Sequence, residues 1–244
     1  MLRLNRILID MDAVRHNYRL MRQSVPHHVQ VMAVVKANAY GHGMLETARA
    51  LEAEGAAHFA VATPDEGIEL RLGGVKGEIL VLGAAMPRAA EDAVAYGLTQ
   101  TVFTPDMVRL IDGCAARLGC MASVHVKVDT GMTRIGVRPE EAAAFCSYVA
   151  GLENVHLEGM FTHFAVSEIE DKTFTRAQAE RFAAYADIAR RYGHTPLLHA
   201  SNSGGVLDLP EFQFDMVRAG IALYGYHPAG AAGIADLRPV LSWK

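Results

Sequence analysis

Among the residues that could take part in catalysis, Lys36 has the most informative sequence neighbours. It lies in Val34–Gly43, Val-Val-Lys-Ala-Asn-Ala-Tyr-Gly-His-Gly, after an apolar run, Val31–Val35, that is typical of a buried strand. The segment Tyr40–Gly43 predicts a tight turn that opens a helix. At the carboxyl end of a strand, apolar surroundings would lower the pKa of the amine and expose the nucleophile that Schiff-base chemistry requires. A strand-end lysine that extends into water is the plain alternative.

Four later segments also join an apolar run to polar residues. They are Val124–Gly136 (Val-His-Val-Lys-Val-Asp-Thr-Gly-Met-Thr-Arg-Ile-Gly), Gly159–Phe164 (Gly-Met-Phe-Thr-His-Phe), Ala200–Gly204 (Ala-Ser-Asn-Ser-Gly) and Asp215–Gly225 (Asp-Met-Val-Arg-Ala-Gly-Ile-Ala-Leu-Tyr-Gly). Taken alone, each has a structural explanation. His163 suits a hydrogen-bonded core histidine, Ser203 suits a capped turn, and Arg218 suits a surface ion pair with Asp215.

The elements that must position these residues alternate along the chain. Short apolar runs that predict strands are separated by longer, mostly amphipathic runs that predict helices. The predicted strands are Val31–Lys36, His58–Ala62, Glu78–Leu82, Thr99–Phe103, Ser123–Val128, Leu157–His163, Pro196–His199 and Phe214–Arg218. Alternation of this kind implies a parallel sheet in the α/β class, and eight units fit a closed (β/α)₈ TIM barrel. An open doubly wound sheet is the competing architecture, but no GxGxxG or Walker-type loop supports it.

A (β/α)₈ barrel carries its active site at the carboxyl ends of its strands. The candidate residues follow that rule in chain order: Lys36 at the first strand, Arg134 after the fifth, His163 at the sixth, Ser203 after the seventh and Arg218 at the eighth. The sequence therefore predicts that these five side chains meet on one face of one barrel.

The composition of the chain argues against several classes of protein, among them nucleic-acid-binding and membrane proteins. The chain has 244 residues, 51% of them hydrophobic, and a formal net charge of −4 without a basic block, which argues against a nucleic-acid partner. Cys114, Cys120 and Cys146 have no CxxC spacing and suit small core residues of a reduced compartment. No signal peptide, membrane span or metal-ligand spacing is recognised, so we expect a cytoplasmic protein without a metal.

The quoted segments, in this order and spacing, resemble those of alanine racemases over nearly the whole chain. The resemblance implies that Lys36 bonds covalently to pyridoxal 5′-phosphate and acts as the base on the D-substrate face. It further implies an isomerase that interconverts L- and D-alanine, supplies D-alanine for cell-wall peptidoglycan and acts as a homodimer.

Cofactor contacts follow from the same resemblance. The side chains of Tyr40 and Ser203 would donate to the phosphate, beside Asn202. Backbone amides of Ser203, Gly220 and Ile221 would complete the phosphate cradle, because glycine lets the backbone approach an anion closely.

The remaining site residues would act on the ring and on the substrate. By resemblance, His163 packs against the pyridine face, and Arg218 faces the pyridine nitrogen. An arginine keeps its proton at ordinary pH, so that nitrogen would stay unprotonated. Arg134 would approach the ring oxygen and bind the substrate carboxylate. Lys127 aligns with a lysine that is carbamylated in some family members, and a carbamate there could orient Arg134.

The resemblance also predicts a division of the chain. Residues 1–9 would form a strand that pairs with a C-terminal β domain, residues 10–226 the cofactor-binding barrel, and residues 227–244 a connector and the start of that β domain. The rest of the β domain, with the tyrosine that serves as the second base, would be absent. We therefore expect weak cofactor binding and little or no activity from these 244 residues alone.

Two alternatives remain at this stage. One keeps the chemistry and changes the substrate to serine or another small amino acid. The other is a non-catalytic single-barrel protein that binds pyridoxal phosphate for cofactor homeostasis. Such proteins have a similar length but lack the Ala-Asn-Ala-Tyr-Gly-His-Gly and Gly-Ile-Ala-Leu-Tyr-Gly signatures.

Overall fold

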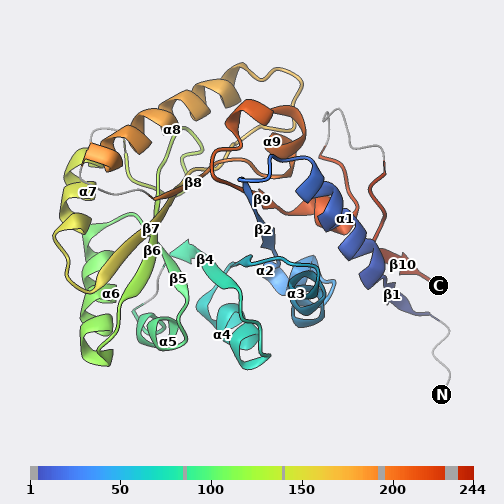
Figure 1. The fold of residues 1–244 in the computed structure, drawn as a ribbon, viewed down its shortest axis with the longest axis horizontal. Coiled ribbons are helices and arrows are strands. Elements are labelled where there is room, and N and C mark those ends of the chain that lie inside the picture. The colour runs from blue at the N-terminus through green and yellow to red at the C-terminus, as the bar shows by residue number, and fades with distance from the viewer. Residues whose placement is uncertain (1–4, 85–86, 139–140, 192–195, 229–235) are drawn as a thin grey trace.

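The computed structural model describes residues 5–84, 87–138, 141–191, 196–228 and 236–244. Its centre is a closed barrel of parallel strands in the order β2 to β9 (Figure 1). The strands are β2 (Gln30–Val34), β3 (His58–Val61), β4 (Glu78–Ala84), β5 (Thr99–Val102), β6 (Ala122–Lys127), β7 (Val155–Phe161), β8 (Leu197–His199) and β9 (Met216–Ala219). Pairing of β2 with β9 closes the ring. The predicted (β/α)₈ barrel is confirmed, and each predicted strand overlaps an observed one.

Helices surround the barrel. They are α1 (Met11–Gln23), α3 (Met44–Ala53), α4 (Pro64–Leu72), α5 (Ala90–Ala95), α6 (Pro105–Leu118), α7 (Ala142–Ala150), α8 (Thr173–Arg191) and the short α9 (Ser203–Asp208). Local sequence sets several of their starts. The Asp10 side chain caps α1, and a threonine followed by proline begins both α4 and α6.

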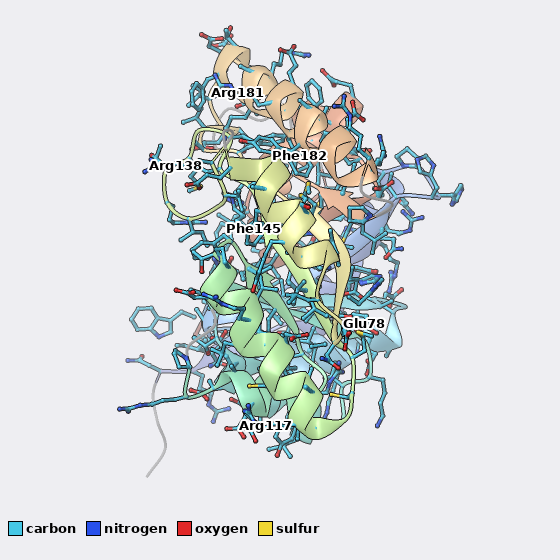
Figure 2. All side chains as sticks on the ribbon, turned by 90° about the vertical axis from the view of Figure 1, so that its left-hand side faces the viewer. Glu78, Arg117, Arg138, Phe145, Arg181 and Phe182 are labelled. Atoms are coloured by element: carbon cyan, nitrogen blue, oxygen red, sulfur yellow. The ribbon has the colours of Figure 1, made fainter. Side chains whose placement is uncertain are left out.

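Two layers of side chains fill the interior, as alternation along each strand requires. On β6, Val124 and Val126 point outward and pack under the helices, in a cluster that includes Phe145 of α7 and Phe182 of α8 (Figure 2). His125 of the same strand contacts side chains inside the barrel and is 2% exposed. The outer layer is thus apolar, whereas the barrel interior combines polar groups such as His125 with an apolar cluster that includes Met32, Leu80 and Met216.

A two-stranded sheet lies beside α1 (Figure 1). Its strands are β1 (Ile7–Ile9) and β10 (Leu241–Trp243), which pair antiparallel. The buried side chain of Asn17 holds the C-terminal segment against α1, because it donates to the Leu223 and Arg238 carbonyls and accepts from the Arg238 amide. Within the described residues, the N-terminal strand therefore has its partner in the last strand of the same chain.

Gly225 allows that segment to pack closely on the barrel. Its φ is +85°, and a Cβ there would meet the Arg238 carbonyl and lie 2.6 Å from the Pro239 Cα. Gly225→Ala should therefore lower the free energy of unfolding by about 2–4 kcal/mol, from left-handed strain and a backbone collision. Gly119 is the matched control, because its φ is +64° and its Cβ would meet open space. Gly119→Ala should cost only about 1 kcal/mol. Equal losses in urea unfolding would show that the contact with residue 238 contributes nothing.

Candidate active site

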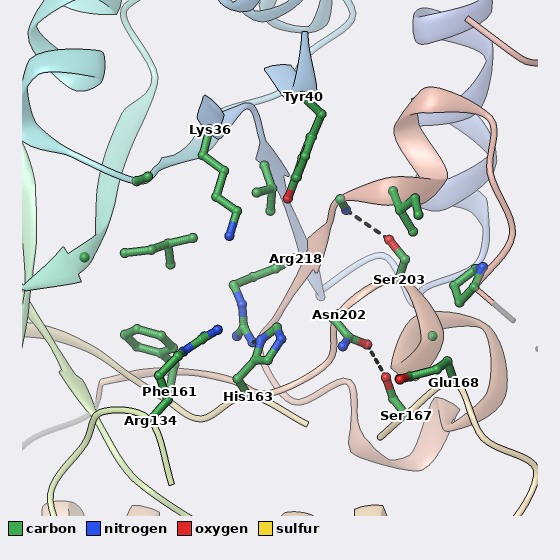
Figure 3. A pocket seen from close by; sticks show the side chains of 18 of the residues that line it. Lys36, Tyr40, Arg134, Phe161, His163, Ser167, Glu168, Asn202, Ser203 and Arg218 are labelled. Atoms are coloured by element: carbon green, nitrogen blue, oxygen red, sulfur yellow. Dashed lines mark hydrogen bonds between the residues drawn. The ribbon is translucent and has the colours of Figure 1, made fainter. Parts of the chain in front are cut away.

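A cavity of about 620 Å³ opens at the carboxyl ends of the barrel strands. All ten sequence-predicted site residues line it: Lys36, Tyr40, Lys127, Arg134, His163, Asn202, Ser203, Arg218, Gly220 and Ile221. Figure 3 shows the Lys36 amine and the Tyr40 hydroxyl on one side, with His163 and Arg134 across from them and Ser203 beside them. The structure therefore brings these residues together, while their roles stay predictions.

Lys36 occupies a different local structure from the one predicted. Strand β2 ends at Val34, and Lys36 begins the short segment α2 (Lys36–Tyr40). The next four residues, 37–40, all have φ of 52° or 53°, a left-handed conformation that costs roughly 1–2 kcal/mol per residue. The predicted strand is thus two residues too long, because the chain leaves the extended conformation at Val35, before the left-handed turn begins.

Two side chains hold that left-handed turn. The Glu66 carboxylate accepts from the Ala37 amide and from the Ala62 amide, each at 2.7 Å. The Asn38 side-chain oxygen accepts from the Met44 amide at 2.8 Å, which joins the turn to helix α3. These hydrogen bonds offset the strain and fix the direction in which Lys36 leaves the backbone.

Electrostatics favour a neutral amine on Lys36. Burial lowers its pKa below the ordinary value, and the nearby cations Arg134 and Arg218 lower it further. The Glu66 carboxylate opposes them. The amine is therefore easier to deprotonate than that of a surface lysine, which is the condition for nucleophilic or basic chemistry.

Arg218 lies inside β9 and is 3% exposed, so the surface ion pair with Asp215 is wrong. Its guanidinium donates to the Thr162 and Ala200 carbonyls and to His199 Nδ1, at 2.8–2.9 Å. Asp215 instead accepts from the Leu198 amide. The Nε–H of Arg218 has no acceptor in the described part of the chain, so it is available to a ligand.

His163 follows β7 at the cavity wall. Its Nδ1 lies 3.2 Å from an Arg218 nitrogen, for which it can only be an acceptor. Burial, with Arg218 and other cations nearby, lowers the pKa of His163 to about 2. The imidazole is therefore neutral and presents an uncharged ring to the cavity.

Lys127 is a buried amine beside the same cations. Its Nζ donates to the Val128 carbonyl at 2.8 Å and lies 5.6 Å from the centre of the Phe161 ring. Burial lowers its pKa from 10.5 to about 7, Arg218 and Arg134 lower it further, and Asp129 opposes them. A large share of Lys127 is thus neutral near pH 7.

Ser203 and Gly220 form one wall that suits an anion. Ser203 Oγ accepts from the Gly220 amide at 3.0 Å and the Ala222 amide at 3.3 Å, which leaves its own hydrogen to donate. A Cβ on Gly220 would lie 3.7 Å from the Tyr40 hydroxyl and 3.9 Å from Ser203 Oγ, so a substituent there would project between them. The amides of Ser203 and Ile221 meet no acceptor among the described residues.

Asn202 shapes that wall. Its side-chain oxygen accepts from the Gly205 amide at 3.1 Å and from Ser167 Oγ at 2.7 Å, so it caps α9 (Figure 3). This cap orients the Ser203 backbone toward the cavity.

Sequence reasoning missed several residues of the site. Phe161 and Glu168 line the cavity, and Glu66 supports the lysine turn. A signal existed for two of them. Phe161 lies two residues before His163 in the quoted motif, and Thr63-Pro-Asp-Glu66 is a capping box, whose last carboxylate reaches backbone amides. No sequence pattern pointed to Glu168.

The charge of the cavity is unbalanced. Its described lining holds four basic side chains, Lys36, Lys127, Arg134 and Arg218, against the carboxylate of Glu168. Such a wall attracts ligands with more than one negative group. Elsewhere in the described residues, no group of three or more His, Cys, Asp or Glu is placed to hold a metal ion, and no helix is both long and apolar enough to cross a bilayer.

A closed barrel with a desolvated lysine and an anion-binding wall at its carboxyl end belongs to the class of barrels that can bond a phosphorylated ligand through an amine. The pattern of the family described as "Alanine racemase, N-terminal domain" matches residues 9–228. This chain therefore belongs to the alanine racemase family.

Individual relatives agree. The chain is 48% identical to the alanine racemase of Desulfovibrio desulfuricans over 97% of its length and 64% of that protein. It is 40% identical to that of Halothermothrix orenii, over 97% of its length and 63% of that protein. A solved alanine racemase of Clostridium difficile superposes with a TM-score of 0.95 at 36% identity, covering all of this chain and 64% of that one. The chain thus spans a little under two thirds of each of these three relatives.

Lys127 provides a pH test of the site. Between about pH 7 and 10.5 the unfolded chain keeps a proton on this amine that the folded chain has lost, so stability rises with pH. Below pH 7 the burial penalty is fully present. In buffer free of carbon dioxide, where the amine carries no carbamate, Lys127→Met should therefore raise the free energy of unfolding at pH 7 by about 2–4 kcal/mol, a gain that fades toward pH 10. The exposed Lys76 is the control, and Lys76→Met should change stability by under about 0.5 kcal/mol at either pH. A pH-independent effect at Lys127 would contradict its lowered pKa.

Proposed function

We propose that this chain is the cofactor-binding barrel of a pyridoxal-phosphate isomerase that interconverts L- and D-alanine and supplies D-alanine for peptidoglycan. The observation that carries the proposal is that the Lys36 amine and the anion-binding wall of Tyr40, Ser203 and Gly220 open into one cavity. Family membership supports the same reaction, because the relatives that match are named alanine racemase. It favours this reading over a single-barrel homeostasis protein.

The residues fit the cofactor. A phosphate needs several donors around one point, which Tyr40, Ser203 and the free Ile221 amide supply. A side chain on Gly220 would fill that space. On the opposite wall, the unpaired Nε–H of Arg218 suits an acceptor such as a ring nitrogen.

When bound, pyridoxal phosphate would serve as the electron sink that makes the α-hydrogen of an amino acid acidic. The Nζ of Lys36 would take that proton in its deprotonated form, which burial and nearby cations favour because they lower its pKa. Arg134 binds the substrate carboxylate through its planar fork. Arg218 donates a hydrogen bond to the ring nitrogen and keeps its own proton, since even a pKa of about 9 leaves it charged at neutral pH. The neutral His163 packs against the ring.

The assembly is part of the proposal. By family resemblance, residues 1–9 and 227–244 join the barrel of residues 10–226 to a β domain. A tyrosine of that domain, from the partner subunit of a homodimer, would supply the second base. We place the enzyme in the cytoplasm, where its product would be needed. Serine or another small amino acid is the alternative substrate.

Lys36 should be the lysine that bonds to the cofactor. After incubation with pyridoxal phosphate and borohydride reduction, peptide mapping should find the label on Lys36, because its amine is the desolvated one beside the anion-binding wall. In the full-length protein, Lys36→Ala should also abolish interconversion of L- and D-alanine, measured by polarimetry or chiral chromatography.

Lys127 and Lys172 serve as internal controls for this labelling. Lys127 also lines the cavity, and Lys172 is held by Asp208 and the Ser167 carbonyl. A reduced label on either one in place of Lys36 would overturn the assignment. Full racemase activity without Lys36 would overturn the reaction.

We also propose that Lys127 is carbamylated. A neutral amine attacks carbon dioxide, forms an N–C bond and releases a proton, and a pKa of about 7 supplies that amine near neutrality. The product is an anion beside Arg134. ¹³C-bicarbonate should therefore give a carbamate resonance that acidification removes and that Lys127→Met lacks. A signal that persists in that variant would place the modification elsewhere.

A further inference from the structure

A column of hydrogen-bonded side chains runs through the barrel from the cavity toward the opposite end. Arg218 Nη1 lies 2.9 Å from His199 Nδ1, and His199 Nε2 lies 2.9 Å from His125 Nδ1. His125 Nε2 in turn lies 3.3 Å from a carboxylate oxygen of Glu158. His199 is fully buried, and Arg218 and His125 are 3% and 2% exposed. The column thus connects a buried cation to a carboxylate through two imidazoles.

A register shift directs Glu158 into this column. Val124 of β6 pairs with Leu157 of β7, but the next residue, His125, pairs with Gly159. Glu158 is therefore an extra residue in β7, and such bulges re-aim side chains. Leu157 belongs to the outer apolar layer, whereas the Glu158 carboxylate contacts His125 within the barrel.

Packing fixes the two rings. The His199 ring stacks on Phe161 with centroids 4.8 Å apart and planes 8° from parallel. A Cβ on Gly159 would lie 2.5–2.6 Å from three atoms of the His125 ring, so only glycine leaves room for that imidazole. Neither ring has space to turn, and the hydrogen-bond directions are set by the fold.

Donor and acceptor chemistry then assigns every proton in the column. An arginine only donates, so His199 Nδ1 accepts and its Nε2 carries the hydrogen. His125 Nδ1 must accept that hydrogen, which places the second imidazole hydrogen on His125 Nε2, facing the carboxylate. A carboxylate only accepts. The two ends of the column therefore demand the same tautomer of both histidines.

The column places the negative charge of Glu158 at one end and the positive charge of Arg218 at the other. A buried guanidinium without a counter-charge is costly, and the nearby cation Arg134 makes the environment of Arg218 more unfavourable. The hydrogen bond from His125 lowers the pKa of Glu158, which keeps that carboxylate ionised. Thr99 Oγ1 donates to the same carboxylate oxygen at 3.0 Å.

We propose that Glu158 is a positioning residue for Arg218: its charge, relayed through His125 and His199, orients the guanidinium and leaves Nε–H directed to a ligand. The column is a property of the chain itself. Only its consequence for the reaction rests on the proposed function.

Imidazole nitrogen resonances test the column on the 244-residue protein without added cofactor. With ring-¹⁵N histidine, His125 and His199 should both be neutral Nε2–H tautomers, with a scalar coupling across the bond from His199 to His125. In Glu158→Leu, the His125 hydrogen loses its acceptor. The coupling should weaken or vanish, and exchange of the Arg218 guanidinium hydrogens with water should accelerate about tenfold, as loss of a charge-assisted hydrogen bond implies.

Two further variants make the result specific. Glu158→Gln keeps the shape and an acceptor but removes the charge, so the tautomers should survive while Arg218 exchange still accelerates severalfold. It also covers the case in which the leucine variant does not fold. Thr99→Val removes the neighbouring hydrogen bond from the carboxylate and should behave as the unaltered protein.

Unchanged Arg218 exchange in Glu158→Gln would overturn the proposal, and so would an equal effect of Thr99→Val. The Nδ1–H tautomer in His125 of the unaltered protein would also overturn it. These readouts do not use the cofactor, so a failure to bind pyridoxal phosphate would count against the proposed function alone. Where the cofactor does bind, its affinity should fall about tenfold in Glu158→Leu.

Discussion

The buried guanidinium of Arg218 is the group around which the site is organised. Its partners come from two places that are far apart in the sequence: the Thr162 carbonyl after β7, and the His199 ring and Ala200 carbonyl at the end of β8. The Nη donors of the guanidinium reach these partners only when the strands are held in register, and each buried donor left unpaired would cost roughly 1–3 kcal/mol. The arginine therefore ties barrel closure to the geometry of the cavity.

Lys36 depends on a second constraint, the left-handed turn of residues 37–40. Four consecutive non-glycine residues in that conformation persist only where the surrounding structure holds them. Glu66 of α4 does so, and it also raises the Lys36 pKa that burial lowers. The same carboxylate thus sets both the direction of the lysine and part of its electrostatic environment.

Much of this could be predicted from the sequence, and the reason is physical. Buried parallel strands are short apolar runs, and barrel topology places their carboxyl ends on one face, so the gathering of Lys36, Arg134, His163 and Ser203 follows from strand order. The left-handed turn could not be predicted, since no glycine marks residues 37–40. The inward position of Glu158 could not be predicted for a related reason. It depends on a register shift between β6 and β7, which alternation within one strand does not reveal.

The two ends of the barrel axis balance opposite charges. At the carboxyl end, burial and then the crowded basic side chains lower the pKa of Lys36, Lys127 and His163, which favours the neutral forms of these groups. An anionic ligand would offset part of the repulsion among these basic side chains and raise the lowered pKa values. Ligand binding and the protonation of the amines are therefore coupled. At the amino end, the Glu158 carboxylate compensates one cation permanently, through rings that cannot turn. Arg218, Lys36 and Lys127 therefore line one cavity but differ in their surroundings. Arg218 is held by the column and stays charged, whereas Lys36 and Lys127 have lowered pKa values and can lose a proton.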